Sequence, residues 1–550
     1  MKFRKAILSI FALAVGCLLL SNLPLWAADE SSPQMTSSQA IAFAVTPPLR
    51  ELAKMPVQPY YSFHQAHSVR RTGAHPNHPY EFDPVEQSSP GAPANITPGL
   101  NLLGLDNAQA CGCQPPDTNA AVGDTQVVEW VNVAYEIFNK TTGAVEAGPI
   151  FGNQLWQSLG GACFDNNDGD IIVSWDRTNH RWLLAQNVFN GPPYYACVAV
   201  STSADATGSY YEYQFPLAQD FPDYPKWGIW PTGYFQTNNN FGNVNFDGAY
   251  VCGYNSAKLL VGDHTAEQIC FQLTPGDSSL LPGDLDSNTP PPANQDEFFI
   301  GAYDSDGQND HLYLYSMHPV FSNPTQSTFV GSGLANPVTV PTYTPFCDNS
   351  EFCVPQQGTS TKVDALGDRV MYRFSYWDDG PLANVKPNAG PLHQQHWYVN
   401  HVTTASGGQA GVRWYEFRAN VQTVNIGGVR LFQSGTFAPD SNYRWMASIA
   451  QDKMGDIALG YSLSSTTVYD SINATGRVIT DPIGQMETET SLVAGTGSQS
   501  SGDRWGDYSS MQIDGSDQCT FWYAQEYYIV PAAGDNWQTR LVSFKFNGCQ

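Results

Sequence analysis

One pattern occurs three times in this chain: Ala120-Ala121-Val122-Gly123-Asp124 before Val127-Val128-Glu129-Trp130, Met446-Ala447-Ser448-Ile449-Ala450-Gln451-Asp452 before Asp456-Ile457-Ala458-Leu459-Gly460-Tyr461-Ser462, and Met511-Gln512-Ile513-Asp514-Gly515 before Cys519-Thr520-Phe521-Trp522-Tyr523. In each copy a short apolar run enters a polar turn, and a second apolar or aromatic run follows. Runs of this length between such turns are typical of antiparallel strands. Radial repetition of the unit predicts an all-β protein, a β-propeller of about seven blades. Six blades, or two consecutive β-sandwich domains, are the alternatives.

Residues 1–28 have the features of a secretory signal. Three basic residues precede an apolar run over residues 6–20, and the small pair Ala27-Ala28 offers a cleavage point. A lipoprotein signal at Cys17 is a weaker alternative, because the apolar run continues beyond that cysteine. No later segment is apolar enough to cross a bilayer. The sequence therefore predicts export, to the cell surface or the medium, without a membrane span.

Composition changes twice along the rest of the chain. Residues 29–111 are rich in Pro, Ser, Gln and His, which predicts a flexible arm or linker. Residues 112–550 read as one β-propeller domain, because Val, Tyr, Phe, Trp and Thr runs alternate with Gly, Asn, Asp and Pro turns. The final strand, residues 540–546, is expected to pair with an early strand of the domain and close the ring. The predicted units begin near Asn119, Asp170, Tyr224, Glu297, Lys362, Trp445 and Tyr508.

The chain is strongly acidic, with a net charge of −26 that becomes −29 when the three basic residues leave with the signal. A surface of this sign repels phosphate backbones and anionic lipid, so nucleic acid is not an expected partner. It is compatible with calcium, neutral glycans or cationic ligands. Ten cysteines follow the signal, an even number suited to disulfides in an oxidising compartment. The most economical pairs are Cys163–Cys197, Cys252–Cys270, Cys347–Cys353 and Cys519–Cys549, which leave Cys111 and Cys113.

Charged residues stand just before the predicted innermost strand of most units. In a propeller these positions converge at the rim of the central channel, so residues far apart in the chain become neighbours. A ring of carboxylates, basic groups and aromatics suits a sugar, because arginine holds hydroxyl or carboxylate groups and two carboxylates can act as acid and base. The alternative is that Arg–Asp pairs only join neighbouring blades. The positions are Asp117, Asp168, Asp170, Asp223, Tyr224, Lys226, Lys362, Asp364, Arg444, Asp503, Arg504, Asp507 and Tyr508, and three of the basic residues precede Trp227, Trp445 and Trp505.

Two kinds of metal site are also suggested. The segment Asp165-Asn166-Asn167-Asp168-Gly169-Asp170 groups oxygen ligands within six residues, which predicts a calcium loop held by Asp165, Asp168 and Asp170. Asp304-Ser305-Asp306-Gly307 is a weaker candidate. Histidines at zinc or copper spacing occur in two groups, of which the first reads better as solvated side chains. They are His64, His67, His75 and His78 in the arm, and His393, His396 and His401 in the fifth unit.

Several long motifs resemble those of a largely uncharacterised family of exported bacterial β-propeller proteins. They are Phe221–Pro231 (FPDYPKWGIWP), Arg504–Ser509 (RWGDYS), Asp168-Gly169-Asp170 with Trp175-Asp176 and Arg181-Trp182, and Cys519–Tyr523 (CTFWY). The resemblance covers residues 115–528 and implies a sialidase-like propeller and export, with no defined activity. Sialidases hold a carboxylate with three arginines and use a Tyr–Glu nucleophile pair with an Asp acid. By that analogy Arg373, Arg444 and Arg504 would form the trio, with Tyr508, Glu416 and Asp170 as the chemistry, although the chain has no clean copy of the sialidase Ser-x-Asp-x-Gly-x-x-Trp turn.

The leading hypothesis is glycan recognition at the channel mouth, with glycoside hydrolysis as the reaction if the protein is an enzyme. The catalytic candidates are Asp170, Asp507, Tyr508 and Glu416; the substrate-binding candidates are Asp117, Lys226, Trp227, Arg373, Arg444, Trp445, Arg504 and Trp505. The alternatives are a non-catalytic extracellular binding or adhesion protein and a metal-dependent secreted enzyme that uses the His393 group. We expect a monomer whose partner is an extracellular glycan or protein, and calcium is the single cofactor that the sequence suggests.

Overall fold

Antiparallel strands make up nearly all the regular structure in the computed structural model of the protein. The structure describes residues 33–55, 80–242, 245–302, 309–331, 335–347, 352–380, 394–420, 422–529 and 536–550, and residues 33–550 belong to one unit. The predicted signal, the histidines at 64–78, the loop at 304–307 and His393 lie outside the described residues.

The strands form seven successive blades, each with its first strand innermost. The first three blades are β5 (Thr118–Val122), β6 (Gln126–Val131), β7 (Ala134–Asn139) and β8 (Val145–Phe151); β9 (Ile172–Asp176), β10 (Arg181–Val188), β11 (Tyr195–Ser201) and β12 (Tyr210–Pro216); and β13 (Phe221–Trp230), β14 (Gly233–Phe241), β15 (Phe246–Tyr254) and β16 (Glu267–Gln272). Blades 4 and 5 are β17 (Leu281–Leu285), β18 (Glu297–Gly301), β19 (His311–His318) and β20 (Thr328–Val330), and β24 (Met371–Asp378), β25 (Gln394–Thr404), β26 (Ala410–Asn420) and β27 (Arg430–Phe437). Blades 6 and 7 are β28 (Tyr443–Gln451), β29 (Ile457–Ser465), β30 (Val468–Arg477) and β31 (Thr490–Val493), and β32 (Ser510–Ile513), β33 (Phe521–Tyr528), β34 (Trp537–Phe546) and β4 (Ile96–Asp106).

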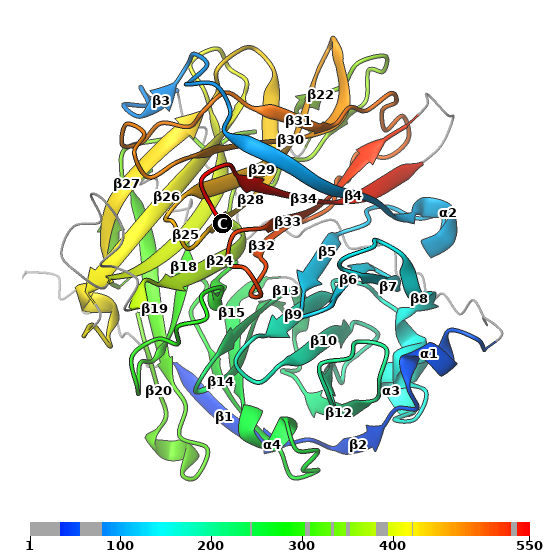
Figure 1. Ribbon diagram of the computed structural model, residues 1–550. Helices are drawn as coiled ribbons and strands as arrows, with labels where there is room; N and C mark the ends of the chain where they lie inside the picture. Colours follow the sequence, from blue (N-terminus) through cyan, green and yellow to red (C-terminus); the bar gives the residue numbers. More distant parts are fainter. Residues whose placement is uncertain are drawn as a thin grey trace, which may run out of the picture. The chain divides into compact units, whose positions relative to one another are not determined.

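The seven innermost strands form a closed ring, visible around the centre of Figure 1. Each contacts the next in the order β5, β9, β13, β17, β24, β28 and β32, and β32 contacts β5 again. Strands β17 and β24 also pair in parallel, which joins blades 4 and 5 into one ten-stranded sheet. The protein is therefore a seven-bladed β-propeller, and the alternatives of six blades or two sandwiches are wrong. Blade 4 begins one strand earlier than expected, because the unit predicted near Glu297 starts at its second strand, β18.

The segment assigned to an arm by its composition contributes a strand to each of four blades. Strand β1 (Gln34–Gln39) pairs with β16, β2 (Ala42–Val45) pairs with β12, and β3 (Glu86–Gln87) pairs in parallel with β27. Strand β4 pairs with β34, so the C-terminal strand does close the ring, but on a strand of the predicted arm and not on an early strand of residues 112–550 as expected. These are outer positions, where partly exposed, polar sequences such as that of β1 are compatible with pairing because one partner strand satisfies the backbone. The described part of residues 29–111 is thus built into the sheets.

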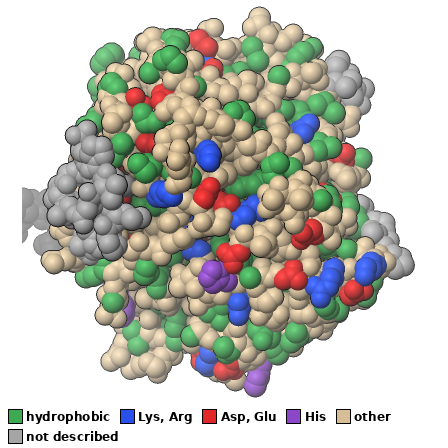
Figure 2. Space-filling view, viewed as in Figure 1, with side chains coloured by type: hydrophobic (Ala, Val, Ile, Leu, Met, Phe, Trp, Pro, Cys, Tyr) green, Lys and Arg blue, Asp and Glu red, His purple; other side chains and the backbone are tan. Residues whose placement is uncertain are grey.

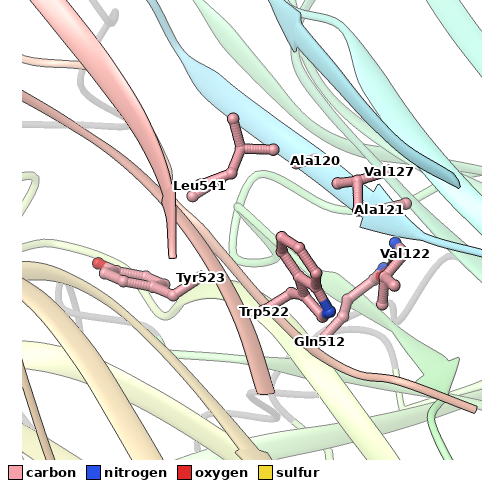
Figure 3. A pocket seen from close by; sticks show the side chains of 9 residues that line it. Ala120, Ala121, Val122, Val127, Gln512, Trp522, Tyr523 and Leu541 are labelled. Atoms are coloured by element: carbon pink, nitrogen blue, oxygen red, sulfur yellow. Dashed lines mark hydrogen bonds between the residues drawn. The ribbon is translucent and has the colours of Figure 1, made fainter. Parts of the chain in front are cut away.

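The blades pack through apolar side chains, as the seam between blades 7 and 1 illustrates (Figure 3). Trp522 and Leu541 lie opposite Val122 and Val127, and the gap left between them has a volume of about 10 Å³. A cavity of this size has room for a single water molecule at most. This seam is therefore part of the core and is not a ligand site.

Short elements and disulfides complete the fold. Five disulfides join Cys111–Cys113, Cys163–Cys197, Cys252–Cys270, Cys347–Cys353 and Cys519–Cys549, which confirms the four expected pairs. The helices are single turns: α1 (Leu49–Leu52), α2 (Asn107–Ala110), α3 (Gly161–Asp165), α4 (Ser256–Leu259) and the 3₁₀ turns η1 (Gly152–Trp156), η2 (Pro324–Gln326) and η4 (Ile426–Gly428). Strand β21 (Pro337–Thr339) pairs with β19, and β22 (Val354–Pro355) pairs with β23 (Lys362–Val363). Within the described ranges, helices are neither long nor apolar enough to cross a membrane.

Candidate functional site

Five blades have a residue in the left-handed backbone region just before or within the first residues of their innermost strand. The φ angles are 48° at Asp117, 48° at Asp170, 56° at Tyr224, 48° at Ser279 and 49° at Met446. None of these is glycine, and a left-handed L-residue costs on the order of 1–2 kcal/mol. The chain therefore bends sharply where it enters the channel. Three of the five are sequence-predicted residues of the channel mouth.

These bends bring ionisable residues from blades 1, 2, 3, 5 and 7 together. The backbone N–H of Asp507 donates to Oδ1 of Asp117 over 2.7 Å, and that of Tyr224 donates to Oδ2 of Asp170 over 3.3 Å. Arg504 forms an ion pair with Asp507. We call this set the mouth cluster. It consists of Asp117, Asp170, Asp223, Tyr224, Lys226, Asp364, Arg369, Arg504, Asp507 and Tyr508.

Lys226 is the fully buried cation of the mouth cluster. Its Nζ lies 3.4 Å from the ring centroid of Tyr224 and 4.2 Å from that of Tyr508, and it donates to the carbonyl of Pro225 over 3.0 Å. Burial lowers the pKa of Lys226 to about 8, although the surrounding aspartates oppose this shift. Among the described residues no carboxylate oxygen lies within 4 Å of this ammonium, so the two aromatic faces replace a direct ion pair.

The carboxyl groups around Lys226 hold their protons more tightly than ordinary aspartates. Burial and the nearby Asp507 raise the pKa of Asp117 to about 7 and that of Asp223 to about 6. Burial together with neighbouring acids, Asp117 first, raises the pKa of Asp170 well above its usual range. Asp170 is half-buried, whereas Asp117, Asp223 and Asp507 are buried. Asp170 therefore combines a carboxyl group of raised pKa with a residue position that is only partly buried.

Several polar atoms in and beside the mouth cluster have no hydrogen-bond partner within the described protein. They are Oδ2 of Asp223, Oη of Tyr224, Nη1 of Arg369 and Nε1 of Trp505, all buried. Arg369 itself is held in place by Asp368, at 2.7 Å from Nε and 2.9 Å from Nη2, and lies over the Tyr224 ring. Buried polar atoms are normally paired, and each unpaired one costs about 1–3 kcal/mol. Arg369 is not among the residues predicted from the sequence, where its only signal is the Asp368-Arg369 pair just before β24.

Two predicted site residues, Arg373 and Arg444, lie in separate ion-pair networks. Arg373 is bound by Asp284 (2.7 Å) and Asp286 (3.0 Å), and Arg444 is bound by Asp440 (2.9 Å) and Glu489 (2.7 Å). The structure thus does not bring Arg373 and Arg444 together with Arg504, and no three-arginine clamp forms.

Glu416 is also engaged elsewhere, in blade 5. Its Oε1 lies 2.8 Å from Nδ1 of His396 and is paired with Arg418. Burial alone would raise the pKa of Glu416, but these partners lower it to about 2. A carboxylate so firmly ionised and enclosed is a structural group rather than a nucleophile.

The predicted tryptophan platforms are core residues. Trp227 stacks on Tyr254 at 4.9 Å, and the rings of Trp445 and Trp505 meet edge to face at 5.3 Å. Each is at most 2% exposed, so none offers a free face to a sugar ring. These three tryptophans are therefore not stacking platforms, because other side chains already cover the faces of their rings.

The predicted calcium loop does not gather its carboxylates. Asp165 is exposed at the end of α3, Asp168 accepts a hydrogen bond from the backbone N–H of Phe189 over 2.8 Å, and Asp170 belongs to the mouth cluster. Throughout the described part of the chain, no group of three His, Cys, Asp or Glu side chains is placed to hold a metal ion.

The two described histidines of the fifth unit have structural partners. His396 lies between Asp379 (3.0 Å) and Glu416 (2.8 Å), and His401 bonds the hydroxyl of Tyr415 over 2.8 Å. Burial and Arg413 lower the pKa of His401 to about 3, which keeps its imidazole neutral.

The face shown in Figure 2 carries acidic and basic side chains interspersed among uncharged ones. It has no broad patch of positive charge, in line with the acidic composition of the chain. Binding to a phosphate backbone would need such a patch.

Comparison with known proteins gives weak structural likenesses only. No family model matches the chain, and no curated protein matches its sequence, so the resemblance to a family of exported bacterial propellers stays a prediction. Among solved structures, the chain is similar to an endo-arabinase from Bacteroides thetaiotaomicron VPI-5482 (12% identity over 57% of this chain and 94% of that one, TM-score 0.27). It is also similar to a GH43 β-1,3-galactosidase (8% identity, 83% and 96%, TM-score 0.26) and to the WD40 domain of coronin from Toxoplasma gondii (10%, 84% and 90%, TM-score 0.35). At these scores the likenesses carry no argument about activity or ligand.

Proposed function

We propose that the protein is an exported glycan-binding propeller whose ligand enters the mouth cluster, and that Asp170 acts there as the acid in glycoside hydrolysis. The observation that carries the proposal is the state of Asp170: a half-buried carboxyl whose pKa is raised by burial and by neighbouring acids. A general acid in glycoside cleavage needs this combination of a retained proton and access to the substrate.

The reaction would use two carboxyl groups of the cluster. Asp170 donates its proton to the glycosidic oxygen as the bond from that oxygen to the anomeric carbon breaks. A water molecule adds to the anomeric carbon, and its proton passes to the carboxylate of Asp507, which Arg504 holds in an ion pair. Deprotonation of Asp507 and reprotonation of Asp170 from solvent restore the site.

The composition of the cluster favours a neutral, hydroxyl-rich ligand over an anionic one. Five carboxyl groups surround three cations, and two of the cations, Arg369 and Arg504, are already paired with aspartates. The unpartnered atoms of Asp223, Tyr224 and Arg369 include both acceptors and donors, as sugar hydroxyls require.

The test is hydrolysis and binding of neutral polysaccharides by wild type and Asp170→Asn. Reducing-end release from arabinan, galactan, xylan, mannan and β-glucan measures cleavage, and retardation in native gels that contain the same polymers measures binding. We expect Asp170→Asn to lose at least about 100-fold in rate while binding is retained. Asp165→Asn, an exposed change in the same loop, is the matched control and should leave both unchanged. Cleavage by Asp170→Asn at the wild-type rate would refute the assignment.

A non-catalytic glycan-binding protein is the second candidate. It is favoured by the tight enclosure of the cluster, since Lys226 is 0% and Asp117 2% exposed. In that case wild type would retard in the gels and release no reducing ends from any polymer.

A further inference from the structure

A second concave site, distinct from the mouth cluster, lies where blades 5 and 6 meet. We call it the rim groove; its volume is about 640 Å³. It is formed by the β25–β26 turn, the segment that leads into β28, the β29–β30 turn and the chain around β3. The lining residues are Glu86, Ser88, Pro355, Ser406, Gly407, Gln409, Ala438, Asp440, Ser441, Tyr443, Ser465, Thr466 and Thr467. None of them belongs to the mouth cluster.

Strand direction places the rim groove on the same face as the mouth cluster. The innermost strands β24 and β28 start at the mouth, and the strands of each blade alternate in direction. The β25–β26 and β29–β30 turns therefore return to the mouth face. The groove lies on that face over the turns between the second and third strands of its two blades and beside the start of the innermost strand β28.

The groove is lined by hydroxyl groups and holds no basic side chain. Six serine and threonine hydroxyls line it, together with one amide, two carboxylates and one aromatic ring, that of Tyr443. Hydroxyls act as both donors and acceptors, so they match ligands with many hydroxyls of their own. The volume falls in the range of sites for small organic ligands, about 300–1,000 Å³.

Both carboxylates of the groove are tied into its walls. The carboxylate of Glu86 accepts hydrogen bonds from the N–H (2.8 Å) and Oγ (2.6 Å) of Ser406, which lie across the groove from β3. The carboxylate of Asp440 accepts from Arg444 over 2.9 Å and from the backbone N–H of Asn442 over 2.8 Å. These hydrogen bonds satisfy both carboxylates within the protein and hold the walls of the groove in place. A cationic peptide would have to displace them, whereas a neutral ligand would not.

A further bond joins the two blades at the groove. The side-chain amide of Gln409, in the β25–β26 turn, donates to the carbonyl of Asp440 over 2.9 Å. The groove is therefore preformed, and a ligand would not have to order its walls on binding.

We infer that the rim groove binds a neutral oligosaccharide segment, of the same glycan whose reactive part enters the mouth cluster. The choice of a glycan rests on the proposed function; the groove itself and its chemistry do not. The substrate would then be a polymer rather than a single sugar, because one molecule can occupy both sites only if it is a chain that spans them. Linked sites raise the apparent affinity of such a polymer above that of either site alone.

The test uses the mature chain in native gels that contain arabinan, galactan, xylan, mannan or β-glucan, with polygalacturonate and a poly-lysine peptide as charged comparisons. Ser441→Trp places a large ring in the groove at an exposed position, so the fold should be unaffected. Thr141→Trp, in the exposed β7–β8 turn of blade 1, is the matched control. We expect Ser441→Trp to weaken binding of a neutral polymer at least about 10-fold while Thr141→Trp binds as wild type, with equal melting temperatures for all three proteins.

The outcomes separate the groove from the mouth cluster. Loss of binding in Ser441→Trp, with cleavage of a short oligosaccharide retained, supports the groove and leaves the role of Asp170 intact. Unchanged polymer binding by Ser441→Trp overturns the groove even if Asp170→Asn abolishes cleavage. Binding of poly-lysine or polygalacturonate in place of neutral polymers overturns the assigned ligand class. Failure of wild type to bind any neutral polymer overturns both proposals.

Discussion

Replacing Glu129 with glutamine should make the protein more stable at pH 8 and change little at pH 5. Glu129 is 0% exposed and lies in β6, directly opposite Glu136 of β7. Burial raises the pKa of Glu129 to about 8, although hydrogen bonds from Thr539 and the backbone N–H of Leu105 (2.8 Å) oppose the shift. Its Oε1 has no partner among the described residues. The side chain therefore stays protonated in the folded protein over much of the physiological range.

The size of the effect follows from the difference between the pKa values of Glu129 in the folded and unfolded chain. In the unfolded chain Glu129 loses its proton near pH 4.5, and in the folded chain near pH 8. The folded state binds the extra proton between these values, so the stability contributed is full below pH 4.5 and is lost as the pH rises to about 8. Each unit of pKa difference corresponds to about 1.4 kcal/mol, which sets a ceiling of about 5 kcal/mol for this one group. Glutamine has nearly the same shape and no proton to lose, so this part of the pH dependence disappears in the variant.

Urea unfolding followed by tryptophan fluorescence, at pH 5 and pH 8, measures the effect. With a slope of at least about 3 kcal/mol per molar urea for a chain of this size, we expect the midpoint of Glu129→Gln to exceed that of wild type by about 1 M at pH 8. Glu51→Gln is the control, because Glu51 is exposed on α1 and paired only with Lys54. It should follow wild type at both pH values within about 0.5 kcal/mol. Equal loss of stability between pH 5 and pH 8 in wild type and Glu129→Gln would refute the reasoning.

Two further changes test the packing and the ion pairs. Gly460→Ala would place a Cβ 2.6 Å from the ring of Tyr523, between blades 6 and 7, and should lower the stability by about 1–3 kcal/mol in thermal melts. Gly548→Ala is the control: no atom lies within 4 Å of the added methyl, so this variant should melt as wild type. Burial alone would lower the pKa of His396, but the carboxylates of Asp379 and Glu416 raise it. The contribution of His396 to stability is therefore present below pH 6.5 and is lost as the pH rises past its folded-state pKa. His396→Gln should therefore lose about 1–3 kcal/mol at pH 5.5 and less at pH 8.5, and an equal loss at both would contradict the assigned charge state.

The position of the site could be predicted from the sequence because it depends on one geometric rule. Residues before the innermost strands converge wherever the blades do, so Asp117, Asp170, Lys226, Arg504 and Asp507 are neighbours despite separations of hundreds of residues. The rule says where a backbone position lies and not which way its side chain points.

That limit explains the residues that the rule misplaced. Arg444 begins an innermost strand but turns to Glu489, an outer-strand partner that no local pattern reveals. Trp445 and Trp505 are at the expected positions, yet their rings complete the core between blades. Nothing in the sequence indicates the left-handed backbone of Met446 beside them, because most left-handed residues are glycine or asparagine.

The arm shows a second limit of composition. Strand β1 reads Gln-Met-Thr-Ser-Ser-Gln and is mostly exposed, so it has neither the apolar alternation nor the aromatic content of the inner strands. Its stability comes from pairing with an existing edge, β16, rather than from a face of its own. A strand of this kind is defined by its partner, and the partner is more than 200 residues away in the chain.

Closure of the ring links the stability of the fold to the geometry of the mouth cluster. Strand β4 completes blade 7 at its outer edge, and the buried Glu129 of blade 1 accepts a hydrogen bond from the backbone of that same strand. Across this seam Asp507 donates to Asp117, one of the bonds that assemble the cluster. Ionisation of Glu129 near pH 8 places a buried negative charge in blade 1, beside the strand that completes blade 7. The loss of stability between about pH 4.5 and pH 8, and any loss of ligand binding as Glu129 ionises near pH 8, should therefore be reduced together in Glu129→Gln, although Glu129 does not belong to the mouth cluster.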